Sequence, residues 1–339
     1  MASWKDKFKY SVPVHLSATN WDNTQHRRSI AASLVQGVYV LEEDRQHNRK
    51  GHHALAPPWW SSFNFQSQPQ VLIDDSDSSI FGAIYKFESP LNTSSCKYVL
   101  AFRGTVIKWS TIKQDIKLDL HYVFSQHKLQ NSSRVAKALR VVKILVDQVG
   151  AANVWLAGHS LGSLIALLVG RNMVKMGFLL ETYLFNPPFS SLSIPLELLI
   201  KNKILKFGAR LIGDVIRAGL SLGLIGHQAS QVDNPFIKLS GWTPYLFVNP
   251  KDPICSQYVA YFEQRKKMVS IGAFTVGNMG TQVSVMSIVA SRSLATEPYH
   301  LLPTAYLVTN LNKTKTKESH KLSQWWSEGF TGALELHNF

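Results

Sequence analysis

The sequence predicts an α/β protein with a mostly parallel, doubly wound sheet and helices on both of its faces. Between residues 133 and 185, helical and strand-like apolar patterns alternate, and alternation at these lengths is typical of a parallel sheet covered by helices. The chain of 339 residues is 45% hydrophobic. It can therefore bury a sizeable core, which excludes a disordered or low-complexity protein.

The N-terminal part of the chain predicts a loose arm, one helix and two strands. Residues 1–25 are polar and mixed, and we expect them to form an arm. Within 28–41 the apolar residues recur at helical spacing, whereas residues 47–70 are rich in Pro, Ser, His and Trp and indicate an irregular surface segment. Strand-like runs follow at 80–87 and 98–102.

The middle of the chain gives the clearest pattern. Ser132 or Ser133 can cap a helix that Gly150 ends. A short apolar strand at 154–157 precedes a second, largely apolar helix at 161–176. The pattern repeats the strand–helix unit of a parallel sheet.

The second half of the chain continues the sheet after an interruption. Strand patterns at 183–185, 245–248 and 305–308 are separated by an apolar, lysine-bearing stretch at 190–230. That stretch predicts a helical insertion, which either packs on the sheet or forms a mobile cap. We therefore expect one domain over residues 26–310, followed by a C-terminal tail, 311–339, whose placement the pattern leaves open.

The charge and cysteine content restrict the class of protein. The formal net charge is +14, and residues 101–339 carry 26 Lys and Arg against 13 Asp and Glu. Such an excess fits a solvated basic surface or contact with an anionic membrane surface, while no nucleic-acid-binding signature is present. Two cysteines exclude a disulfide scaffold and a Cys-rich zinc site.

Neither a secretory signal nor a transmembrane segment is expected. The first lysines are followed by no apolar stretch. The most apolar uncharged run, 154–170, is 17 residues long, short of the roughly 20 that a membrane span needs. We expect a soluble, cytoplasmic protein, with any membrane contact peripheral.

Gly158-His159-Ser160-Leu161-Gly162 fits the pattern G-x-S-x-G. It follows a predicted buried strand and opens a predicted helix, as a nucleophile elbow requires. In such a turn the flanking glycines avoid clashes with the neighbouring strand and helix, and the serine hydroxyl projects beyond the strand. The context predicts Ser160 as a catalytic nucleophile; the alternative is a tight structural turn.

A nucleophilic serine requires a base and a carboxylate that orients the base, in the chain order Ser, acid, His. Asp252 directly follows a predicted strand, where parallel sheets place their active sites, and we prefer it to Asp214 and Asp233. His300 lies in a loop just before the last predicted strand and is the expected base. His227 precedes Asp252 and so breaks the order, while His320 and His337 lie in the polar tail.

An oxyanion hole needs two backbone N–H donors. Leu161, directly after the nucleophile, is expected to supply one. Thr105, in the segment Arg103-Gly104-Thr105 after an early strand, is expected to supply the other. The alternative for this segment is an ordinary turn.

Taken together, residues 98–105, Gly158 to Gly162, Asp252 and His300 resemble the class 3 (fungal-type) lipases. The stretches around Ser160 and at 184–189 are most similar to a plant subgroup labelled "GDSL esterase/lipase", although no Gly-Asp-Ser-Leu string occurs. The resemblance covers roughly residues 25–310. It implies an α/β-hydrolase fold, a Ser160–Asp252–His300 triad with Thr105 and Leu161 as oxyanion donors, and no cofactor or metal.

The expected function is therefore hydrolysis of carboxylic esters through an acyl-enzyme. The resemblance implies acylglycerol or phospholipid-like substrates. Two alternatives stay open: a lipase-like binding or scaffold protein without turnover, and an acyltransferase in which an alcohol replaces water.

Overall fold

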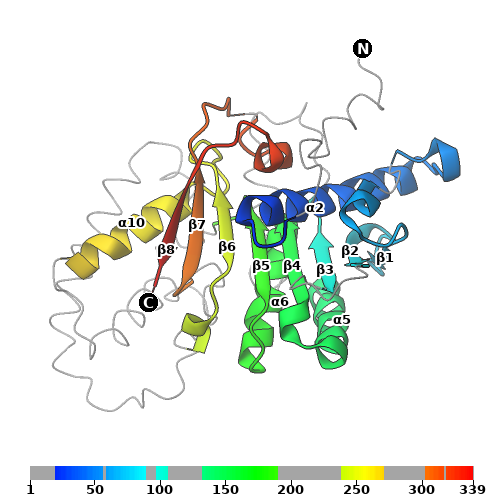
Figure 1. Ribbon diagram of the computed structural model, residues 1–339, viewed down its shortest axis with the longest axis horizontal. Helices are drawn as coiled ribbons and strands as arrows, with labels where there is room; N and C mark the ends of the chain where they lie inside the picture. Colours follow the sequence, from blue (N-terminus) through cyan, green and yellow to red (C-terminus); the bar gives the residue numbers. More distant parts are fainter. Residues whose placement is uncertain are drawn as a thin grey trace.

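The computed structural model describes residues 20–55, 59–88, 97–105, 132–189, 238–270, 302–316 and 318–338. These residues form an α/β structure around one eight-stranded sheet (Figure 1). The strands are β1 (Gln70–Ile73), β2 (Ile80–Lys86), β3 (Tyr98–Phe102), β4 (Val154–His159), β5 (Glu181–Phe185), β6 (Tyr245–Val248), β7 (Ala305–Asn310) and β8 (Gly332–His337).

Four α-helices and several 3-10 turns lie in the described parts of the chain. The helices are α2 (Thr24–Gln46), α5 (Ser133–Val149), α6 (Leu161–Lys175) and α10 (Gln257–Ser270). The turns are η1 (Gly51–His53), η2 (Trp59–Phe63), η4 (Ala151–Asn153), η6 (Leu239–Gly241) and η7 (Leu322–Trp326). The sequence missed α10, because its mixed polar and apolar residues give no clear helical stripe.

The order of the strands in the sheet follows their order in the chain. Strands β3 to β7 are parallel, while β1, β2 and β8 join the edges in antiparallel pairs. A doubly wound sheet reverses its strand order at a switch point, so the structure differs from the prediction in this respect. Helices α5, α6 and α10 all pack on the same face of the sheet. Because crossover connections between parallel strands are right-handed, crossovers on one face add each new strand at the same edge of the sheet, and the strand order does not reverse.

Both faces of the sheet are covered by helices, as the sequence predicts. Alternate residues of β3 enter opposite cores: Leu100 and Phe102 pack with α5 and α6, whereas Val99 and Ala101 pack with α2. This division follows from the two-residue period of a strand. Figure 1 shows α2 lying across the strands, on the face of the sheet opposite to α5 and α6.

The helix ends match their sequence signals. The side chain of Ser132 accepts a hydrogen bond from the Val135 N–H, and Gly150, with φ of 83°, ends α5. The side chain of Asn23 caps α2 in the same way. Helix α2 therefore begins at Thr24, four residues before the start at residue 28 that apolar spacing alone indicates. The additional turn is polar, so periodicity does not detect it.

The C-terminal segment is part of the fold. Strand β8 pairs with β7 over six residues. The indole of Trp325, in η7, is fully buried against the rings of Phe185 and Phe247, and its N–H donates to the side-chain oxygen of Asn186 at 2.7 Å. The C-terminal tail at 311–339, whose placement the sequence left open, thus contributes buried side chains to the core between the sheet and α2.

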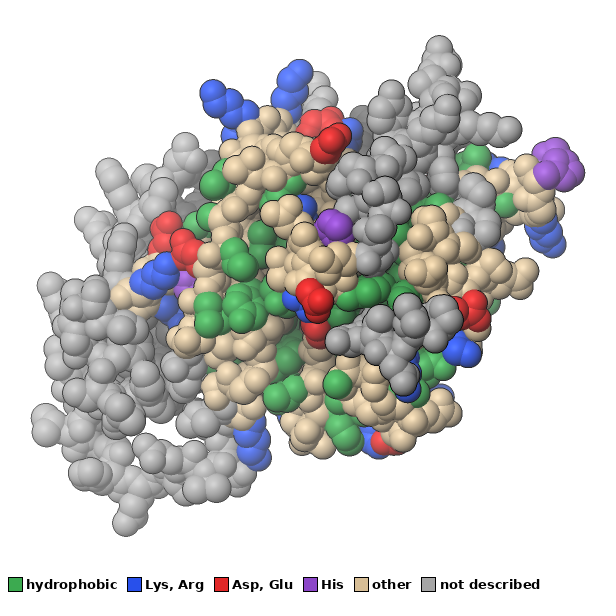
Figure 2. All heavy atoms as spheres, in the orientation of Figure 1, with side chains coloured by type: hydrophobic (Ala, Val, Ile, Leu, Met, Phe, Trp, Pro, Cys, Tyr) green, Lys and Arg blue, Asp and Glu red, His purple; other side chains and the backbone are tan. Residues whose placement is uncertain are grey.

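Within the described parts of the chain, no helix is long and apolar enough to cross a bilayer. Figure 2 shows the described lysines and arginines at separate points on the face in view, with acidic side chains among them. The predicted insertion at 190–230 lies outside the described residues, so its two interpretations stay predictions.

We expect Trp325→Ala to lower the free energy of unfolding by about 3–5 kcal/mol, because it removes a fully buried aromatic side chain. Leu334→Ala, in the same C-terminal segment but 55% exposed, is the control and should change stability by less than about 0.5 kcal/mol. Urea unfolding followed by fluorescence and circular dichroism measures both. Equal, small effects would mean that the segment contributes little to the core.

Candidate active site

Residues that follow five consecutive parallel strands meet at one edge of the sheet. Carboxyl ends of parallel strands share an edge, so loops that leave them converge. In order from β3 to β7, these loops carry Gly104, Ser160, Asn186, Asp252 and His320. Contacts between them, described below, form a single cluster.

Ser160 occupies a strained turn between β4 and α6. Its backbone has φ of 54° and ψ of −123°, a conformation that costs a non-glycine residue about 1–3 kcal/mol. Its N–H donates to the Phe185 carbonyl of the neighbouring strand at 3.0 Å. The predicted strand–turn–helix around Ser160 is therefore present, with the serine 5% exposed.

The two glycines of the motif are required by close backbone contacts. A Cβ atom on Gly162 would lie 2.2 Å from the carbonyl oxygen of Phe102, and one on Gly158 would lie 2.3 Å from the Gly162 oxygen. Both distances are far shorter than van der Waals contact. Helix α6 can approach β3 and β4 this closely only without these side chains.

Asp252 is a fully buried carboxylate held by several donors. Its Oδ2 accepts hydrogen bonds from Asn186 Nδ2 at 2.6 Å and His320 Nδ1 at 2.7 Å, and its Oδ1 accepts from the Ile254 N–H at 3.0 Å. Burial alone would raise the pKa of the Asp252 carboxyl. The charge attraction and hydrogen bond of His320, with the bonds from Asn186 and Ile254, lower that pKa below its ordinary value.

The contact with Asp252 sets the tautomer of His320. An ionised carboxylate only accepts hydrogen bonds, so His320 Nδ1 must carry a proton and Nε2 holds the lone pair in the neutral ring. The His320 ring lies beside that of His159, with 4.8 Å between ring centroids, and His159 directly precedes Ser160. The Asp252–His320 pair thus lies next to the residue that precedes the strained serine.

His320 is not the base that the sequence predicts. The expected base, His300, lies outside the described residues, as do His227, Asp214 and Asp233. His337 lies in β8, stacked on Phe262. His320 fits the chain order Ser, acid, His and follows β7. The sequence around it is polar and rich in lysine, and this pattern indicates a surface tail, not an active-site loop.

The segment expected to form the oxyanion hole lies against Ser160. A Cβ atom on Gly104 would be 2.9 Å from the Cβ atom of Ser160. Thr105 follows and is exposed. Leu161 is the first residue of α6, and the first N–H groups of a helix have no acceptor within it.

His159 links this segment to His320. Its Nε2 lies 2.9 Å from the His320 carbonyl oxygen, and its Nδ1 lies 2.9 Å from the Tyr39 hydroxyl. Complete burial, with the nearby charge of His320, lowers the pKa of His159 to about 3. A neutral ring that donates from Nε2 must accept at Nδ1, so Tyr39 donates its hydroxyl proton there.

No group of three or more His, Cys, Asp or Glu residues in the described ranges is arranged to hold a metal ion. Cys255, buried beside Asp252, points its thiol at the same carboxylate, with Sγ 3.3 Å from Oδ2. The described site therefore consists of serine, histidine, carboxylate, amide and thiol groups.

A curated protein of Arabidopsis thaliana, named a GDSL esterase/lipase, is 42% identical to this chain over 345 aligned positions, which cover 97% of this chain and 96% of the relative. No family model matches the chain, and no solved structure matches it.

Gly162→Ala should destabilise the fold by about 1–3 kcal/mol or more and abolish turnover, since the added methyl group would push α6 away from β3. Gly241→Ala is the control, because a Cβ atom there meets nothing within 4 Å. Thermal unfolding and ester hydrolysis measure the two effects. Wild-type behaviour of the Gly162 variant would contradict the close contact.

Stability should also decrease as the pH falls from about 6.5. The unfolded chain protonates His159 near its ordinary pKa of 6.5, whereas the folded protein resists protonation until about pH 3. The stabilisation is thus complete above pH 6.5 and is lost at up to about 1.4 kcal/mol per pH unit as the pH falls. Urea unfolding between pH 6.5 and 4.5 should give a smaller slope for His159→Gln than for the wild type; equal slopes would argue against a neutral, buried His159.

Proposed function

The chain belongs to the lipase-like family of the plant GDSL esterase/lipase protein, and from that premise we propose that it is a serine carboxylic-ester hydrolase with an α/β-hydrolase fold. The observation that carries the proposal is the buried Asp252–His320 pair beside the strained turn at Ser160. Nucleophile, acid and base then follow the chain order Ser160, Asp252, His320, the order of α/β-hydrolases.

In the proposed reaction, Ser160 Oγ attacks the ester carbonyl carbon while His320 Nε2 takes the hydroxyl proton. The ionised Asp252 stabilises the imidazolium that forms. His320 then gives the proton to the leaving alcohol, and an acyl group remains on Ser160. Water, activated by the same imidazole, releases the acid and restores the serine.

The negative charge of the tetrahedral intermediate requires two donors. We assign them to the backbone N–H groups of Thr105 and Leu161. Leu161 follows Ser160 directly in the sequence, and Thr105 follows Gly104, which lies against the Ser160 side chain. A single donor of this kind contributes about 2.7–4 kcal/mol to transition-state stabilisation. These residues supply all the chemistry of ester hydrolysis, and the proposal requires no cofactor.

For the substrate, we propose acylglycerols or phospholipid-like esters. The support is the resemblance of the Arg103-Gly104-Thr105 and Ser160 segments to class 3 lipases, together with the esterase/lipase name of the relative. Transfer of the acyl group to an alcohol uses the same residues, and product analysis with and without an alcohol acceptor separates the two reactions. A binding protein without turnover is less consistent with a complete serine, acid and base.

Labelling with a fluorophosphonate probe tests the nucleophile. The wild type should be labelled at Ser160, and Ser160→Ala should lose both labelling and ester turnover with an unchanged fold, because only a hydroxyl group is removed. Absence of labelling in the wild type would favour the binding-protein alternative.

The base is tested by comparing two histidines. We expect His320→Ala to reduce kcat by at least about 10³-fold, and Asp252→Asn to add little to that loss, because the two residues act as a unit. His300→Ala is the matched comparison and should keep most activity. The reverse result would restore His300 as the base and leave His320 with a structural role.

A further inference from the structure

We propose that Tyr39 and Arg103 are positioning residues that fix both peptide planes of Gly104 and thereby aim the Thr105 N–H at the oxyanion. The inference rests on the proposed function, in which Thr105 is an oxyanion donor. It goes further by assigning roles to two side chains that the reaction itself does not use. The contacts of Gly104 carry the argument.

The peptide between Arg103 and Gly104 is held by Tyr39. The Gly104 N–H donates to the Tyr39 hydroxyl oxygen at 2.7 Å. The same hydroxyl donates its proton to His159 Nδ1, whose ring donates from Nε2 to the His320 carbonyl. Every donor in this chain has one acceptor, so the direction of each hydrogen bond is fixed.

The next peptide, between Gly104 and Thr105, is held by Arg103. The guanidinium donates from Nη1 to the Gly104 carbonyl oxygen at 2.8 Å. A trans peptide is planar, and its C=O and N–H point in opposite directions; the structure contains no cis peptide among the residues it describes. Arg103 therefore sets the direction of the Thr105 N–H, which points away from the guanidinium.

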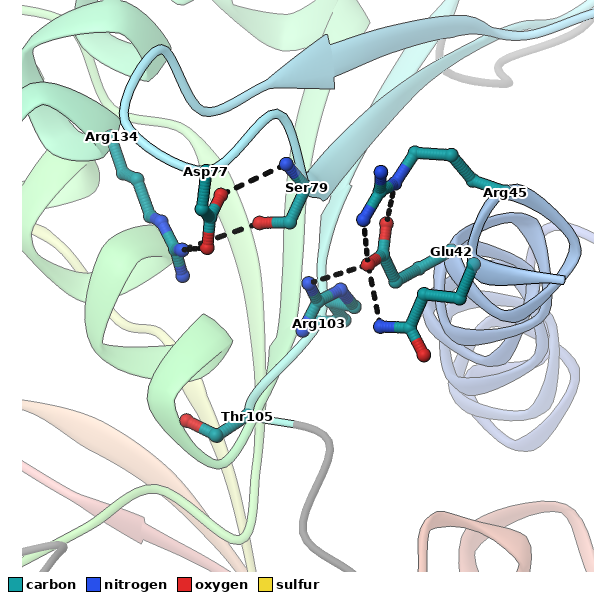
Figure 3. Close-up of a pocket in the computed structure, with 8 residues that line it drawn as sticks. Glu42, Arg45, Asp77, Ser79, Arg103, Thr105 and Arg134 are labelled. Carbon is teal, nitrogen blue, oxygen red and sulfur yellow. Dashed lines mark hydrogen bonds and ion pairs between the residues drawn. The ribbon is translucent and has the colours of Figure 1, made fainter. Parts of the chain in front are cut away.

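Arg103 is itself immobilised. Its Nε donates to the Ile80 carbonyl of β2, and its Nη2 lies 3.8 Å from the Glu42 carboxylate of α2. The side chain is 6% exposed, so a planar guanidinium with several donors is tied to two elements at once. Figure 3 shows Arg103 between Glu42 and the chain that leads to Thr105.

The cavity in Figure 3, about 240 Å³ in volume, is lined by three arginines, including Arg103. It does not have the charge of an anion-binding subsite, because each guanidinium faces a carboxylate. Arg45 and Arg103 share Glu42, while Arg134 pairs with Asp74 and Asp77. The cavity is therefore not assigned as a site for substrate, and Arg103 connects it to the oxyanion loop through the Gly104 carbonyl.

Tyr39 and Glu42 lie three residues apart on α2, close to one helical turn. One helix therefore fixes the first peptide directly and the second through Arg103. Preorganised donors spend no free energy on reorientation as the charge develops. Loss of either contact should therefore weaken binding of the transition state more than binding of the substrate.

The test compares Tyr39→Phe and Arg103→Lys with two matched controls. Tyr85→Phe removes the hydroxyl of another buried tyrosine, for which the described residues offer no hydrogen-bond partner. Arg45→Gln removes the other arginine on Glu42 without a contact to Gly104. Both controls lie outside the proposed catalytic residues.

The readouts are kcat and KM on a short soluble ester and the inhibition constant of an alkyl boronic acid, which forms a tetrahedral adduct with a nucleophilic serine. The concentration of competent sites is first measured with the fluorophosphonate probe. We expect Tyr39→Phe and Arg103→Lys each to lower kcat about 10- to 100-fold, part of the 10²–10³-fold effect of losing a whole donor. KM should change less than about twofold, and boronate affinity should fall in parallel with kcat/KM.

A loss that appears in KM alone, an unchanged boronate affinity, or the same result for the variants and their controls would overturn the inference. A merely structural effect would reduce the fraction of competent sites and leave kcat per site unchanged. If the probe does not label Ser160 in the wild type, the proposed function fails together with this inference. If the probe labels Ser160 in the wild type but Tyr39→Phe and Arg103→Lys behave like their controls, this inference is overturned and the proposed function stands.

Discussion

A buried charge organises the edge of the sheet that carries the proposed active site. Moving a carboxylate out of water costs several kcal/mol unless hydrogen bonds and an opposite charge replace the lost hydration. The donors to Asp252 come from the loop after β5, from its own turn and from the segment after β7, through Asn186, Ile254 and His320. Three loops must close together around Asp252 for its charge to be tolerated, and their closure brings His320 into contact with Asp252. The Trp325 indole in turn holds Asn186, so the C-terminal segment supports the same charge.

The turn at Ser160, the proposed nucleophile, depends on a different constraint: the two glycines beside it have no side chains. Gly158 and Gly162 let α6 approach β3 and β4 to backbone contact, and Ser160 is held in a strained turn by the surrounding structure. Gly104 extends this contact to the next loop, because its Cα lies against the serine side chain. Close packing thus brings the Ser160 side chain and the proposed oxyanion loop together.

Helix α2 joins stability to the proposed chemistry. Its apolar side covers one face of the sheet, and Tyr39 and Glu42 extend from it to the oxyanion loop. The neutral His159 completes this network, since protonation of Nδ1 would oppose the hydrogen bond donated by Tyr39. Burial keeps His159 neutral, and its hydrogen bonds connect the loops after β3, β4 and β7, so acid should weaken the fold and the site together.

By itself the sequence determined the features that depend on local pattern: the alternation of helices and strands from 133 to 185, the strand at 245–248, the caps of α5, and the strand–turn–helix around Ser160. Chain order and strand position also predicted Asp252 as the acid, and the structure places it, fully buried, after β6. The sequence did not predict strand β8. Its leucines, Leu334 and Leu336, are about half exposed, so the strand lacks the alternation of apolar buried and polar exposed residues that marks a strand in a sequence. Only the tertiary structure decided that His320 meets Asp252, 68 positions away, and that Tyr39 meets His159, 120 positions away. No local periodicity records which loops converge; that depends on strand register and on the hydrogen bonds needed by groups buried far apart in the chain.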